Sequence, residues 1–130
     1  MSYIIDKKRK LVVSTARGSV TYLEVIELLG RLKKDPDFSP AYGHLVDHTE
    51  VTEFARTVQE VGLLATGHIF SPLSQWAFVA PGDLALELTR EFNSLQNKPG
   101  APKALAFRDT EVALRWFGYG EEDDKDTARR

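Results

Sequence analysis

The chain has 130 residues, 42% of them hydrophobic and 28% charged, and it contains no cysteine. That length suits one domain with its own core. The lack of cysteine excludes disulfides, thiolate metal sites and cysteine nucleophiles, and it is consistent with a protein of the reducing cytoplasm. The formal net charge of −2 arises in the last ten residues. The only basic cluster, residues 7–10, lies at a predicted hairpin turn and is too short to form the basic stripe that binds nucleic acid.

A β-hairpin and a helix are predicted at the N-terminus. Residues 3–6 and 10–16 read as two strands around the basic turn. Thr21 and Glu24 have the spacing of a capping box, in which both side chains accept backbone N–H groups, and they predict the start of a helix. Pro36 predicts its end, because proline cannot continue a helix interior. The apolar residues expected on its buried stripe are Tyr22, Val25, Ile26, Leu29 and Leu32.

A short buried strand is predicted at residues 44–46, followed by Asp47, a polar turn and an amphipathic helix. The helix is expected because Phe54, Val58 and Val61 recur at helical spacing. The loops at strand ends of an open α/β sheet usually carry the working residues of such folds. We therefore expect the functional surface in this stretch.

The apolar loop at residues 68–73 has two interpretations. If exposed, it would be a surface for a partner or for dimerisation. Alternatively, Ile69 and Phe70 cover the bottom of the core. The sequence leaves both interpretations open.

The second half of the chain predicts two further strands and two further helices. Residues 75–80 form a nearly continuous apolar run, which is typical of a parallel strand covered on both faces, and residues 104–107 form the last strand. Asp83 and Asp109 are predicted to cap the helices that follow them. The charged residues 119–130 are expected to form a disordered tail.

The predicted order of elements is β-β-α-β-α-β-α-β-α. Strands that alternate with helices indicate right-handed βαβ crossovers. The predicted fold class is therefore α/β, with a mainly parallel β-sheet and an antiparallel N-terminal hairpin strand. Residues 1–118 are expected to form a single domain.

Several local sequence matches support a family resemblance. They are Gly18-Ser19-Val20-Thr21, Asp35-Pro36-Asp37-Phe38, Leu45-Val46-Asp47, Phe107-Arg108-Asp109 and Ala113-Leu114-Arg115-Trp116. Together with the opening hairpin, they resemble the SpoIIAA-like group, which shares the fold of STAS domains, over about residues 3–118. This resemblance implies a non-catalytic regulatory or protein-interaction module. The fold is also similar to that of lipid-binding Sec14 domains, which implies a small-molecule or lipid-binding domain as the alternative. Such a domain is expected to have a cavity between the sheet and the helix at residues 54–64 or the helix at residues 84–95.

In the regulatory branch of STAS domains, the turn after this strand carries an Asp-Ser-Ser-Gly phosphorylation motif. Placing Asp47 on the family pattern brings residues 55–58 over that motif, so the resemblance implies Thr57 as the phosphoacceptor. The aspartate, both serines and the glycine of the motif are missing here. That departure favours an ordinary solvated helix residue at position 57.

Polar residues near the carboxyl ends of the predicted parallel strands form one candidate face. The candidate binding residues are Arg17, Asp47, His48, Thr49, Arg56, Thr57 and Arg108. Such a cluster could hold an anion or do acid–base chemistry. However, aspartate caps repel phosphate at two helix starts, and the chain has no glycine-rich phosphate loop. We expect no cofactor.

Catalytic and metal sites have weaker support. His44 and His48 would share a face of a strand, but His48 is expected beyond the strand's end, so no metal site is predicted. No serine lies on a Gly-x-Ser-x-Gly elbow, and we expect no enzyme activity.

The remaining expectations concern location and partners. No apolar run approaches the roughly 20 residues that cross a bilayer, and the first residues lack the layout of a signal peptide. We therefore expect a cytoplasmic protein with no membrane span and no nucleic-acid partner. It is expected to bind a protein partner, with a homodimer or a small apolar ligand as alternatives.

Overall fold

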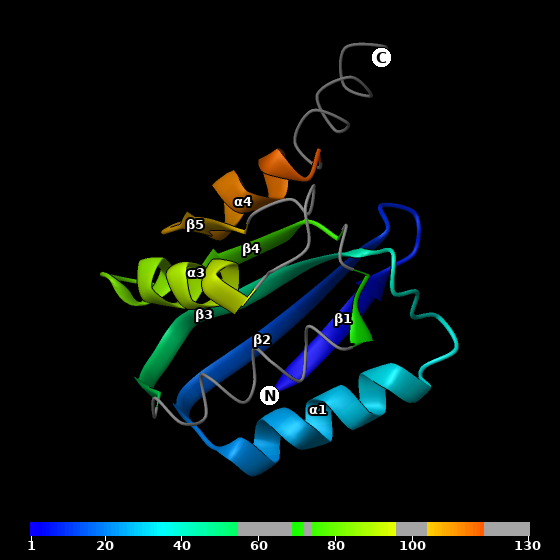
Figure 1. The fold of residues 1–130 in the computed structure, drawn as a ribbon, viewed down its shortest axis with the longest axis horizontal. Coiled ribbons are helices and arrows are strands. Elements are labelled where there is room, and N and C mark those ends of the chain that lie inside the picture. Colours follow the sequence, from blue (N-terminus) through cyan, green and yellow to red (C-terminus); the bar gives the residue numbers. More distant parts are fainter. Residues whose placement is uncertain (55–68, 72–73, 96–103, 119–130) are drawn as a thin grey trace.

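One five-stranded sheet organises the fold (Figure 1). The computed structural model describes residues 1–54, 69–71, 74–95 and 104–118. The strands lie side by side in chain order, with β1 antiparallel to β2 and all other pairs parallel. They are β1 (Ser2–Asp6), β2 (Leu11–Val20), β3 (Gly43–Phe54), β4 (Trp76–Val79) and β5 (Leu105–Phe107). The predicted α/β class and the antiparallel edge strand are confirmed.

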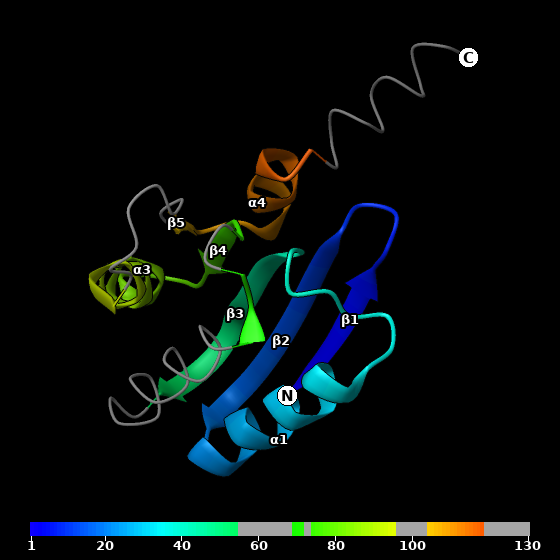
Figure 2. The ribbon, with the colours of Figure 1, turned by 45° about the vertical axis from the view of Figure 1, so that its right-hand side comes forward.

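Three described helices cover this sheet: α1 (Tyr22–Lys34), α3 (Leu84–Leu95) and α4 (Thr110–Trp116). Because side chains alternate along a strand, neighbouring residues of the inner strands pack in different cores. Val12 and Val46 pack in one cluster with Leu32 of α1 and Leu88 of α3. Leu45, the neighbour of Val46, packs in the other with α4. Hence α1 and α3 lie on the inner face of the sheet, and α4 lies on the outer face (Figure 2).

The first helix follows its sequence signals closely. The Thr21 side chain accepts from the Glu24 amide, the Glu24 side chain accepts from the Thr21 amide, and the helix ends at Lys34. The predicted buried stripe is wrong at Ile26, which is 39% exposed, whereas Leu28 is 3% exposed. The buried face of the helix is formed by residues that lie three or four positions apart and meet the sheet, namely Val25, Leu28, Leu29 and Leu32.

Replacing Thr21 with alanine is expected to lower the free energy of unfolding by about 1 kcal/mol, because the Glu24 amide loses its acceptor. Urea unfolding followed by circular dichroism measures the change. Thr21→Ser is the matched control, since it keeps the hydroxyl and should cost much less. Equal losses in the two variants would show that the threonine methyl group, and not the cap, carries the effect.

The third strand is longer than predicted. Asp47, the polar turn expected after it and Phe54, which was expected on the following helix, all belong to β3. The second strand likewise extends past residue 16 to Val20. The two strands pair along this extension, with register shifts that place extra residues in β3. Backbone pairing therefore overrides the local polar composition. Val51 joins Ala16 and Val20 in a small core beneath α1.

The described part of the apolar loop belongs to the core. Phe70 is 4% exposed and its ring stacks on His44 with centroids 4.7 Å apart. Ile69 is half-buried against the same core. The core interpretation is confirmed for these two residues. Residues 68, 72 and 73 of the same loop lie outside the described residues. None of the described helices is long and apolar enough to cross a membrane.

Candidate functional site

An exposed ion pair joins β2 and β3 on the outer face of the sheet. Arg17 and Glu50 are register partners, and Arg17 Nε lies 2.7 Å from Glu50 Oε2. Their side chains are 77% and 61% exposed, so the pair contributes little to stability. Both charges are instead available to a partner.

Asp47 and Thr49 lie beside this ion pair. Asp47 Oδ1 accepts from the Thr49 amide at 3.0 Å and from the Thr49 hydroxyl at 2.7 Å. Asp47 pairs in register with Thr15, two residues before Arg17, and paired residues project to the same side of a sheet. We call Arg17, Asp47, Thr49 and Glu50 the outer polar patch.

His48 does not belong to the outer polar patch, contrary to the prediction. Because β3 continues beyond Asp47, its neighbour His48 turns to the inner face and is 4% exposed. Burial lowers the pKa of His48 to about 4, an effect that the Asp47 carboxylate partly opposes. His48 is therefore neutral at pH 7 and sealed from the surface.

His44 lies on the same buried face. Its Nε2 hydrogen-bonds Ser14 Oγ at 2.8 Å, and its ring packs against Phe70 and Trp76. Burial, together with repulsion from His48, lowers the pKa of His44 to about 3. With Ser14 2% and His44 3% exposed, this serine–histidine pair is part of the core and no substrate reaches it.

Other predicted residues lie apart from the patch or outside the described residues. Arg108 is exposed and directly follows β5, which lies two strands from β3, a separation of about 10 Å. Asp109, next to it, caps α4 by accepting from the amides of Glu111 and Val112. Arg56 and Thr57, the implied phosphoacceptor, lie outside the described residues.

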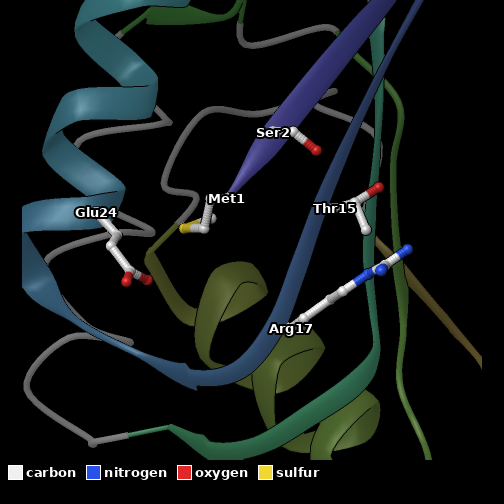
Figure 3. Close-up of a pocket in the computed structure, with 5 residues that line it drawn as sticks. All are labelled: Met1, Ser2, Thr15, Arg17 and Glu24. Carbon is white, nitrogen blue, oxygen red and sulfur yellow. The ribbon is translucent and has the colours of Figure 1, made fainter.

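A polar hollow opens next to the patch (Figure 3). It has a volume of about 430 Å³ and is lined by Met1, Ser2, Thr15, Arg17 and Glu24. Sequence reasoning found Arg17 but missed both the hollow and Glu50. The register of two strands brings these groups together, and only a correct extension of β2 and β3 could have revealed them.

The space between α3 and the sheet is filled by aromatic rings. Phe92 of α3 lies 4.5 Å from Trp76 and 5.7 Å from Phe78, measured between ring centroids. All three residues are at most 3% exposed. This packing occupies one of the two places where a lipid-binding cavity was expected. The other, along residues 54–64, lies almost wholly outside the described residues.

Metal binding finds no support in the described part of the chain, where no group of three histidine, aspartate or glutamate residues is placed to hold an ion. Asp47 and His48 project to opposite faces of β3, and His44 is enclosed by aromatic rings. These positions follow from strand alternation and do not converge on one point.

Comparison with known proteins supports the fold. A solved structure described as an uncharacterized protein from the DUF3478 family with a SpoIIAA-like fold, from Shewanella loihica PV-4, matches with a TM-score of 0.54. It is 23% identical, and the match covers 82% of this chain and 83% of that chain. No family model and no curated protein matches the sequence. The SpoIIAA-like fold expected from the sequence is thus confirmed.

Proposed function

We propose that this protein is a non-catalytic regulatory module of STAS type, which binds a protein partner through a face that includes Arg17 and runs from Asp47 toward Thr57. The observation that carries this proposal is the outer polar patch, where an exposed pair of opposite charges stands on two neighbouring strands. Charges in such a position guide a partner and fix its orientation. The two described histidines, His44 and His48, are enclosed in the core and do not face this patch.

Native mass spectrometry of the protein isolated gently from its own host tests this proposal. We expect a bound protein partner, and an added phosphoryl mass if Thr57 is the acceptor. The double variant R17E/E50R keeps an ion pair but reverses the charge pattern, and it should lower partner occupancy by about tenfold. Lys33→Glu on α1 is the control, because Lys33 is exposed on a different element. Unchanged occupancy in the double variant would mean that another face binds the partner.

The alternative function, a small-molecule or lipid-binding domain, gives a different result in the same experiment. It would appear as a small co-purifying mass on an unmodified chain with no protein attached. The packed aromatic rings beneath α3 weigh against this alternative at that helix. A mass of two chains would identify the homodimer.

A further inference from the structure

We propose that the free edge of β2 at Arg17 binds an extended peptide, which adds antiparallel to β2 in line with β1 and places an acidic side chain opposite Arg17. This inference rests on the proposed function, because it specifies how a protein partner is held. Peptides that add to a sheet edge gain their affinity from main-chain hydrogen bonds and their specificity from alternate side chains.

Among the described residues, no strand pairs with β2 at Arg17 on the side of β1. The pairing of β1 with β2 reaches only as far as Ser2 and Thr15, whereas β2 continues to Val20. Lys10 C=O accepts from the Gly43 amide of β3, so the Leu11 amide across the same peptide bond points the opposite way, toward β1. Residues of a strand direct their backbone groups to alternate sides. Thr15 therefore pairs with Ser2, and Arg17, two residues later, directs its N–H and C=O to the edge beyond β1.

The polar hollow provides the space for such a peptide. Its volume of about 430 Å³ is enough for a short segment. Figure 3 shows Met1 and Ser2 at the start of β1, with Thr15 and Arg17 on the adjoining strand. A peptide entering here would continue the line of β1, beside a stretch of β2 that no other described strand occupies on this side.

The charges around the hollow set the pattern of the peptide. The Arg17 side chain lies on the outer face, and its ion pair with Glu50 uses Nε, which leaves the two terminal nitrogens as donors for a second carboxylate. Glu24 projects from α1, on the inner side of the edge (Figure 3). A peptide that fits these charges has an acidic residue opposite Arg17, which pairs with the guanidinium group. Its neighbouring residues are not acidic, so they are not repelled by Glu24.

The same charges disfavour a second copy of this chain as the occupant. A symmetric antiparallel pairing of two β2 edges at this point would bring the two Arg17 side chains to facing positions on the same side of the sheet. Like charges directly opposite each other destabilise strand pairing. The occupant is therefore a different chain with an acidic residue in its strand.

Amide hydrogen exchange of Arg17, followed by nuclear magnetic resonance, tests the proposal with the peptide acetyl-Thr-Ser-Thr-Lys-Glu-amide. The glutamate is the last residue of this peptide, because β1 already occupies the positions opposite Thr15 and Ser14. At saturation we expect exchange of the Arg17 amide to slow by about tenfold. N-methylation of the peptide's glutamate removes the N–H that faces β2 and should abolish this protection. N-methylation of the preceding lysine, whose N–H faces away, should preserve it. The peptide with glutamine in place of glutamate should bind about tenfold more weakly to the wild-type protein, and equally to Arg17→Gln.

Three results would overturn the inference. They are exchange that the peptide does not slow, equal protection by both N-methylated peptides, and an Arg17 amide protected in a dimer without peptide. Failure here is distinguishable from failure of the proposed function. If native mass spectrometry finds a partner but that partner leaves the Arg17 amide unprotected, the protein-binding function stands and the edge site falls. If no partner is found, the function itself fails.

Discussion

Lowering the pH from 7 to 4 is expected to destabilise the protein strongly, because His44 and His48 accept protons far more readily in the unfolded chain. Their pKa values fall from 6.5 to about 3 and about 4 in the folded state. Below pH 6.5 the unfolded state binds more protons, so each histidine lowers the stability by about 1.4 kcal/mol per pH unit. At pH 4 the combined loss is roughly 6 kcal/mol, which is comparable with the whole stability of a typical domain of about 5–15 kcal/mol.

Urea unfolding at pH 7, 6, 5 and 4.5 measures this slope. This pH range lies above the one in which protonation of Asp35 mainly affects stability. The pKa of Asp35 in the folded state lies below its ordinary value of 3.8, so its contribution to stability is lost only at lower pH. The variant His48→Gln removes one titrating group and should reduce the slope by about 1.4 kcal/mol per pH unit. The variant His44→Gln should do the same while keeping a hydrogen-bonding group near Ser14. A wild-type stability that is constant between pH 7 and 5 would contradict both assignments.

The sequence predicted the fold well where local signals and tertiary packing agree. The Thr21–Glu24 capping box, the Asp109 cap and the apolar run before residue 80 each act within a few residues, and each lies where expected. The antiparallel edge followed from a hairpin, which is also a local feature. Agreement between neighbouring signals and the final packing is what makes such elements predictable.

The candidate site was less predictable because it depends on pairing between distant residues. His48 lies in a polar stretch, and the extension of β3 beside β2 turns it inward. Glu50 became a site residue for the same reason, since only the register with β2 places it opposite Arg17. A change of one residue in strand position moves a side chain to the other face. Predicting the site would therefore have required the correct end of β3.

Replacing Trp76 with alanine is expected to lower the free energy of unfolding by about 3–5 kcal/mol, the usual cost of truncating a large buried aromatic residue. Trp76 is 3% exposed. Its ring centroid lies 4.5 Å from those of His44 and Phe92 and 5.0 Å from that of Phe70. The truncation removes contacts to β3, to α3 and to the loop at once. Urea unfolding followed by far-ultraviolet circular dichroism measures the loss.

Trp116→Ala is the matched control, because Trp116 is half-buried against Phe107 and Phe117 on the outer face. It should cost only about 1–2 kcal/mol, in proportion to the smaller apolar area that it buries. The comparison also bears on the alternative function. If the space beneath α3 normally held an apolar ligand, the ligand-free protein would be loosely packed there, and Trp76→Ala would cost no more than Trp116→Ala. A clearly larger cost at Trp76 means that side chains alone fill this space, so an apolar ligand would have to bind elsewhere.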